Sequence, residues 1–184
     1  MGILIVLVLP LLVLTLELKS PSFEHGGIIP VTYTCDGKNI SPPLLWNGVP
    51  QSAKSLVLIM HDPDAPARDF THWIVYSIPP TVGGLPRAFP KKAVTSHGIK
   101  QGLNDFGFIG YAGPCPPPWD SFHRYRFELY ALDYEPNLPA GATKKEVERA
   151  IRGHILAKAT LEGKYKRTKP FKFAKLIKPI VSSY

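Results

Sequence analysis

The sequence predicts a single, mainly β domain, and three observations carry that prediction. The chain has 184 residues, of which 45% are hydrophobic and 20% charged, the balance of a globular domain. It contains 20 prolines and 15 glycines, and proline interrupts helix interiors. Its apolar segments are short or alternating, as strands are. We therefore expect strands joined by turns, with one or two helices attached.

Three segments have the pattern of strands. Residues 55–61 (SLVLIMH) and 72–78 (HWIVYSI) are short continuous apolar runs, ended by D-P-D-A-P and by a proline pair. Residues 124–132 (RYRFELYAL) alternate, which places Tyr125 and Phe127 on one face and charged residues on the other. The glycine- and proline-rich segments between them are expected to be loops.

One helix is predicted after residue 142. Thr143 and Glu146 have the spacing of a capping box, which marks a helix start. Apolar residues continue at helical spacing as far as Ile155, and Gly163 is the expected stop. Gly153 lies inside this segment and costs about 1 kcal/mol relative to alanine.

The charge is unevenly distributed along the chain. The net charge is +8, but residues 144–184 carry 12 basic and 3 acidic residues, which leaves the remainder close to neutral. A generally basic domain is therefore excluded, and nucleic acid is disfavoured as a partner.

The first residues and the last residues differ from the rest. Residues 1–16 are almost wholly apolar but lack a basic n-region and a small-residue cleavage site, and they are short for a membrane span. A buried strand or oligomer contact is one interpretation, and an uncleaved anchor or atypical leader is the other. Localisation thus stays open, with the cytoplasm favoured over a membrane-anchored or extracytoplasmic place.

A basic tail covers residues 166–184, where lysines recur every third position among aromatic and aliphatic residues. Pro170 and Pro179 interrupt both helix and strand. We expect the tail to fold back on its own domain. Docking on an anionic membrane surface or on another protein is the alternative.

Three places combine titratable residues with a stiff backbone. Asp62 and Asp64 follow a strand directly, in a turn that two prolines restrict. His72 begins the next strand, and His123 closes the glycine- and proline-rich loop 110–124. Strand ends followed by rigid loops are where binding residues gather.

An aspartate and two histidines have several uses. No H-E-x-x-H pair supports a metal site, and no G-x-S-x-G turn supports a nucleophile, so neither a metal nor another cofactor is expected. Imidazole and loop N–H groups can hold a phosphate, or the residues can satisfy one another beneath the loops. Whether Cys35 and Cys115 form a bridge stays open.

Several separate motifs, in order, resemble the phosphatidylethanolamine-binding protein family, most closely its bacterial and archaeal Raf-kinase-inhibitor-like branch. They are YTCDG (33–37), SPP (41–43), LW (45–46), DPDAP (62–66), HW (72–73), NDFG (104–107), GPCPP (113–117) and HRY (123–125). The resemblance predicts a domain over residues 14–165, between an apolar extension (1–13) and the basic tail (166–184).

The resemblance implies an antiparallel β-sandwich of Greek-key type, with one or two peripheral α-helices and a small anion pocket at one end. Family members bind phosphate-type headgroups such as phosphoethanolamine there, and several inhibit serine proteases or kinases without catalysis of their own. The positions that match the family's pocket are Asp62, His72, His123 and Tyr125, with Phe70, Gly113 and Pro117 as walls.

The expected function is therefore that of a non-enzymatic binding protein with a phosphate-headgroup ligand. Because Asp62 would repel a phosphate unless it pairs with a histidine or an ammonium group, the ligand is expected to be zwitterionic. The alternatives are a hydrolase or lyase on a small phosphorylated compound, with His123 as acid/base and Asp62 orienting it, and a membrane-tethered structural protein. Trp119 and Phe122 are expected to narrow or cap the pocket mouth, and a homo-oligomer stays open.

Overall fold

Strands supply most of the regular structure. The computed structural model describes residues 15–67 and 69–167. A six-stranded sheet contains β2 (Gly27–Ile28), β4 (Ser55–Asp62), β5 (Phe70–Ile78), β7 (Lys100–Gln101), β8 (His123–Leu132) and β9 (Ile155–Tyr165). A three-stranded sheet contains β1 (Glu17–Lys19), β3 (Leu44–Asn47) and β6 (Gly84–Leu85). The remaining elements are the 3-10 helices Val31–Tyr33 and Ser96–Gly98 and the α-helix α1 (Lys144–Ile151).

The large sheet has the order β2-β9-β8-β4-β5-β7. Its strand β2 pairs with β9 in parallel, and the other neighbours pair antiparallel. The small sheet has the order β1-β3-β6. This mainly β architecture confirms the predicted fold class, and all three predicted strands are present as β4, β5 and β8.

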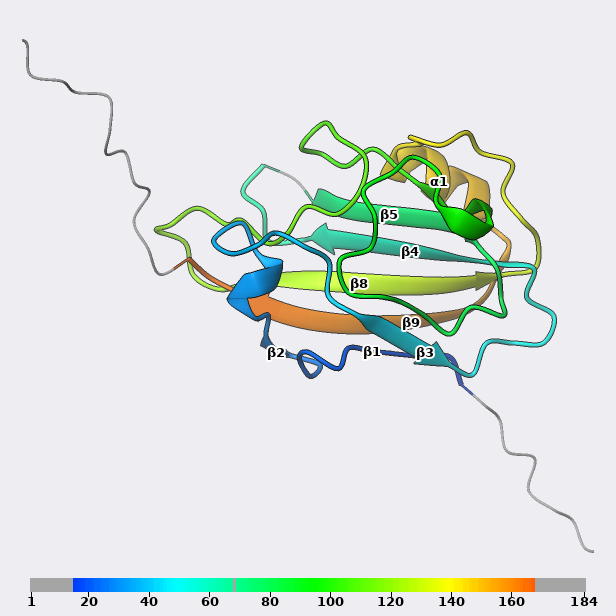
Figure 1. The fold of residues 1–184 in the computed structure, drawn as a ribbon, viewed down its shortest axis with the longest axis horizontal. Helices are drawn as coiled ribbons and strands as arrows, with labels where there is room; N and C mark the ends of the chain where they lie inside the picture. Colours follow the sequence, from blue (N-terminus) through cyan, green and yellow to red (C-terminus); the bar gives the residue numbers. More distant parts are fainter. Residues whose placement is uncertain (1–14, 68, 168–184) are drawn as a thin grey trace, which may run out of the picture.

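Strand β4 is buried along its whole length because both faces of the large sheet are covered. Leu58 and Met60 belong to the core between the two sheets, and Val57 and Ile59 belong to a second core beneath α1. Figure 1 shows α1 near β5, and β1 running beside β9. Full burial of each such side chain stabilises the fold by about 1.5–3 kcal/mol.

The helix begins as predicted but ends early. The amide of Glu146 donates to Oγ1 of Thr143 and the amide of Thr143 donates to Oε2 of Glu146, which completes the capping box. The helix ends at Ile151, and Gly153 has a φ of +84°. The prediction that the helix reaches Ile155 and stops at Gly163 is wrong.

The reason for the early end is tertiary. Residues 155–165 form β9, which pairs with β8 along its length. Backbone hydrogen bonds to a central strand outweigh the small helix propensity of a segment that contains two glycines. Gly163 is needed in β9 because an added Cβ would lie 2.5 Å from a side-chain carbon of Ile29.

The predictions for the two ends of the chain lie mostly outside the described residues. Leu16, the last residue of the apolar run, directly precedes β1 and is buried in the core between the sheets. At the other end, Arg167 donates to Asp36 at 2.7 Å. The leader, the rest of the tail and their proposed partners stay predictions. Within residues 15–67 and 69–167, no helix is long and apolar enough to cross a membrane.

Candidate functional site

The sheet topology brings three predicted positions to one end of the molecule. Strand β4 ends at Asp62, while its two antiparallel neighbours begin there, β5 at Phe70 and β8 at His123. Asp62 pairs in register with Phe70. Figure 1 shows β4 ending where β5 and β8 begin. Phe70 and His123, which follow Asp62 by 8 and 61 residues in the sequence, therefore lie beside it.

A β-bulge turns His72 towards this site. Met60 pairs with Trp73, but the next residue, His61, pairs with Thr71, so His72 is an extra residue on β5. Simple alternation would place His72 and Trp73 on opposite faces. In a bulge, the two residues that lie opposite one partner point to the same face of the sheet, here His72 and Trp73 opposite Met60. The ring of His72 accordingly lies edge-on to Tyr125 of β8, at 5.2 Å.

Asp62 is the centre of the hydrogen-bonding network. Its Oδ2 accepts from Nδ1 of His123 at 2.8 Å, and its Oδ1 accepts from the backbone amide of Asp64 at 2.9 Å. Both the aspartate and the histidine are about 5% exposed or less as side chains. The carboxylate is therefore paired with the histidine, as the sequence-based expectation for a phosphate site required.

His123 lies between two carboxylates. Its Nε2 is 3.2 Å from Oδ2 of Asp120, while Nδ1 bonds Asp62. Burial alone would lower the pKa of His123, but the hydrogen bonds and charges of Asp62 and Asp120 outweigh it and raise the pKa above its ordinary value. Because both acceptors are carboxylates, the ring carries two N–H groups and a positive charge when it makes both contacts.

His72, in contrast to His123, is favoured in its neutral form. Burial lowers its pKa, although the carbonyl of Ala112 and the charge of Asp62 act against that shift. Its Nδ1 donates to the carbonyl oxygen of Ala112 at 2.8 Å. A carbonyl only accepts, so Nδ1 carries the proton and Nε2 has the lone pair. The neutral ring thus offers a ligand an acceptor.

Tyr125 lies beneath the two histidines. Its ring stacks on that of His123 at 6.5 Å, and its hydroxyl is buried without a hydrogen-bond partner among the described residues. Burial and the negative charge of Asp62 raise its pKa far above the ordinary value, so the phenol stays protonated.

The cavity above these residues has a volume of about 200 Å³. It is lined by Asp62, Ala65, Pro66, Phe70, His72, Phe106, Cys115, Pro116, Pro117 and His123. The structure therefore brings five predicted residues to its wall: Asp62, Phe70, His72, Pro117 and His123. Tyr125 and Gly113 are not among the lining residues.

Gly113 packs closely against the loop that contains Tyr33 and Asn39. Its amide donates to Oδ1 of Asn39 at 2.7 Å, and an added Cβ would lie 2.1 Å from the carbonyl oxygen of Tyr33. Cys35 and Cys115, left open by the sequence, form a disulfide 80 residues apart that joins the same two loops. The amide of Cys35 also donates to the carbonyl of Pro114 at 3.0 Å.

Neither Trp119, which is 83% exposed, nor Phe122 lines this cavity, but Phe122 lines a neighbouring cavity that shares His123. That these two aromatic residues narrow or cap the pocket mouth stays a prediction. Phe106 lines the cavity, with its ring 4.8 Å from Phe70 and 5.5 Å from His72, both edge-on. The sequence contained Phe106 within a family-like motif, but nothing local indicated that its loop folds over β5.

A second, outer cavity of about 520 Å³ shares His123 with the first. Asp64 and Arg124 form a bidentate ion pair on its wall, with Nε–Oδ2 and Nη2–Oδ1 distances of 2.8 and 2.6 Å. The hydrogen bonds from Arg124 lower the pKa of Asp64 to about 2. The pair fixes the D-P-D-A-P turn to the start of β8. Nowhere in the described part of the chain do three His, Cys, Asp or Glu side chains gather to hold a metal ion.

A model of the phosphatidylethanolamine-binding protein family matches residues 19–166, which include every residue that lines the cavity beside Asp62. The chain belongs to that family. A UPF0098 protein of Aquifex aeolicus is 54% identical over 153 residues, which cover 83% of this chain and 89% of the relative. One of Methanothermobacter thermautotrophicus is 51% identical, with coverages of 83% and 99%.

Solved structures of the phosphatidylethanolamine-binding family have the same fold. A homologue from Chlamydia trachomatis superposes with a TM-score of 0.75 at 44% identity, covering 84% of this chain and 99% of that one. YbcL of E. coli, described as a member of the mammalian family, gives a TM-score of 0.77 at 32% identity, with coverages of 82% and 98%. The resemblance inferred from the motifs is confirmed.

Proposed function

We propose that this family member is a non-enzymatic binding protein whose small pocket takes a zwitterionic phosphate-type headgroup such as phosphoethanolamine. The observation that carries the proposal is the ion pair of Asp62 with His123 beside a neutral His72, all three on the wall of a 200 Å³ cavity. The pocket thus combines one positive group, one negative group and one neutral acceptor.

Each part of the headgroup has a matching partner. The ammonium group donates to Asp62 and to Nε2 of His72. The phosphate accepts from Nε2 of His123, where it takes the place of Asp120. A cavity of this volume admits a headgroup and leaves a lipid's acyl chains outside.

Calorimetric titration with phosphoethanolamine tests the pocket directly. We expect the wild-type protein to bind it more tightly than inorganic phosphate or ethanolamine alone, and the His123→Ala variant to lose binding. His154→Ala removes an exposed histidine that pairs with Asp133 and serves as the matched control. Wild-type protein that binds none of the three compounds at millimolar concentration would refute the pocket.

The same samples separate binding from catalysis. His123 contacts two carboxylates, an arrangement that general acid/base catalysis can use. Phosphorylated esters are therefore incubated with the wild type and with His123→Ala, and product formation is measured. We expect no turnover. Turnover that disappears in His123→Ala would replace the binding role by a hydrolase or lyase.

Inhibition of a serine protease or kinase is the second part of the proposal. Its support is Trp119, an aromatic residue 83% exposed and two positions after a residue of the pocket wall. Exposed tryptophans often anchor protein partners. In a panel of proteases and kinases, we expect at least one to be inhibited by the wild type and less by Trp119→Ala. Unchanged rates across the panel would remove this role.

A further inference from the structure

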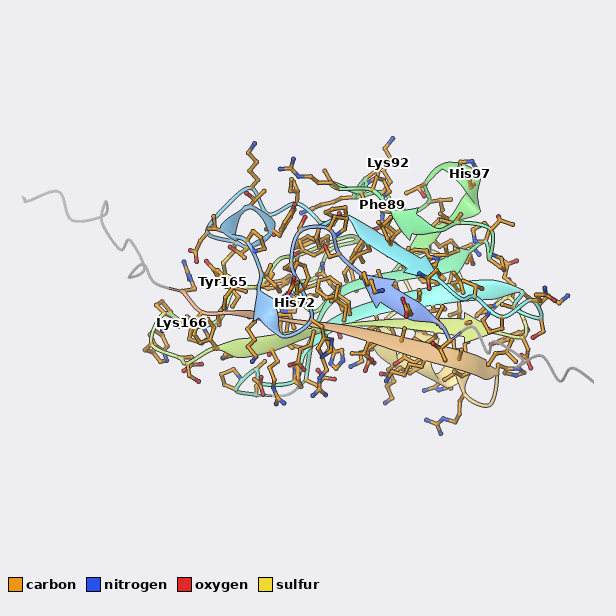
Figure 2. All side chains as sticks on the ribbon, turned by 90° about the horizontal axis from the view of Figure 1, so that it is seen from below. His72, Phe89, Lys92, His97, Tyr165 and Lys166 are labelled. Atoms are coloured by element: carbon orange, nitrogen blue, oxygen red, sulfur yellow. A yellow bond between two sulfur atoms is a disulfide. The ribbon has the colours of Figure 1, made fainter. Side chains whose placement is uncertain are left out.

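A separate cavity lies beside β6, away from the headgroup pocket. Its volume is about 520 Å³, within the range of about 300–1,000 Å³ that is usual for ligand pockets. It is lined by Val82, Gly84, Leu85, Pro86, Phe89, Pro90, Lys92, Thr95, His97 and Ile99. None of these residues lines the first cavity. Figure 2 shows Phe89, Lys92 and His97 gathered at one side of the molecule, apart from His72.

The floor and walls of this β6 cavity are fixed by buried polar groups. Leu85, Phe89 and Ile99 form a buried apolar floor. The side-chain amide of Gln101, which is fully buried, donates to the carbonyls of Pro90 at 2.6 Å and Lys92 at 2.8 Å. The hydroxyl oxygen of buried Ser41 accepts from the amide of Phe89 at 2.9 Å. The cavity is therefore preformed by its own hydrogen bonds.

The polar groups of the β6 cavity are basic or neutral. Lys92 and His97 are the titratable residues among those lining it, with the hydroxyl of Thr95 beside them. The sequence contains no aspartate or glutamate from residue 70 to residue 104, but it contains four lysines and arginines there. An apolar floor with one cationic edge is complementary to a molecule with an apolar body and one negative group.

The backbone holds His97 at this edge in an unusual conformation. Its φ is +67° and its ψ is +17°, in the left-handed region that non-glycine residues rarely adopt. Such conformations persist where the surrounding structure enforces them, and they are common at binding sites. Here the amide and hydroxyl of Thr95 both donate to the carbonyl of Ile99, which closes the turn around His97.

From this cavity we infer that the protein has a second ligand site, for a small aliphatic carboxylate whose chain lies on the Leu85–Phe89–Ile99 floor and whose carboxylate meets Lys92 and His97. The site is independent of the headgroup pocket, since the two share no residue.

Octanoate is the probe, followed on the full chain by calorimetry and by amide NMR shifts. We expect shifts at Leu85, Thr95 and Ile99 and none at His72 or His123. Because each buried methylene adds about fourfold to affinity, octanoate should exceed hexanoate by about an order of magnitude. Octylamine, which has the same chain and the opposite charge, should bind more weakly than octanoate.

Two variants test the cationic edge. Lys92→Met should weaken octanoate binding about fivefold, and His97→Asn, which tolerates the same backbone conformation, should also weaken it. Lys145→Met removes an exposed lysine from α1 and should leave the affinity unchanged. Absence of binding, shifts centred on the headgroup pocket, equal binding of octylamine, or an unchanged affinity in Lys92→Met would each overturn the inference.

Discussion

The two buried histidines of the pocket differ in charge because their ring nitrogens meet different partners. His72 donates to a carbonyl oxygen and is otherwise desolvated, so its neutral form is favoured. His123 meets two carboxylates, so its charged form is favoured. Residue types alone could not distinguish them, since both are histidines within the first three residues of a strand.

In the proposed binding mode, the phosphate displaces Asp120 from Nε2 of His123. We expect Asp120→Asn to bind phosphoethanolamine about threefold to tenfold more tightly, because an uncharged amide is more easily displaced. The comparison is made by calorimetry at pH 6, on the acid side of the raised pKa of His123 in the wild type. Asp133→Asn is the control on a remote ion pair. Equal or weaker binding by Asp120→Asn would show that the carboxylate does not block the site.

The pocket histidines should titrate on opposite sides of their ordinary pKa of about 6.5. NMR titration of the imidazole resonances should give a pKa above that value for His123 and below it for His72. The reverse order, or coincident titrations, would contradict the charge states assigned to the two histidines.

The free energy of unfolding should depend on pH because the pKa of His123 is raised in the folded protein. Because the folded pKa of His123 is raised, its ion pairs stabilise the protein fully below about pH 6.5, and that contribution is lost as the pH rises through the folded pKa. Urea unfolding should therefore show a difference between wild type and His123→Gln that is largest in mild acid and shrinks on the alkaline side. A difference independent of pH would mean that His123 contributes by packing alone.

Among the elements, those with a long and regular pattern were predictable. The alternation of β8 placed Tyr125 and Phe127 on one face, and both belong to the core between the sheets. The start of α1 was also predictable, because a capping box is a local signal. Its end was not, since β9 forms by pairing with β8, more than 20 residues earlier in the chain.

The disulfide links two loops that frame the pocket. We expect the paired variant Cys35→Ser/Cys115→Ser to lose about 2–4 kcal/mol in free energy of unfolding, because the bridge closes a long loop in the unfolded chain. Urea unfolding monitored by tryptophan fluorescence measures this loss. Wild-type protein with a reductant should resemble the variant, and identical midpoints for variant and oxidised wild type would contradict the prediction.

At the scale of the whole molecule, two sheets and α1 enclose two cores, and the cavity beside Asp62 lies at one end of the large sheet. The charge excess of the sequence lies towards the C-terminal end, so it gives little information about the ligand of a pocket built from one aspartate and two histidines. The family match covers residues 19–166 and omits both ends.

Residues 15–167 should therefore be sufficient for folding and headgroup binding. We keep residue 15 because Leu16 and Leu18 are buried, and residue 167 because Arg167 binds Asp36. A chain of these residues is expected to melt within a few degrees of the full chain and to bind phosphoethanolamine equally well. Unfolding or aggregation of the shortened chain would show that the apolar leader or the tail completes the domain.

The sequence by itself determined the mainly β class, the three long strands, the helix start and the identity of most pocket residues, because periodicity, capping and family motifs are local. Only the tertiary structure decided the rest. The bulge that turns His72, the contact of Asp120 with His123, the position of Phe106 and the disulfide all depend on pairing between distant segments. Such pairing is selected by the packing of the whole chain, and no local pattern records it.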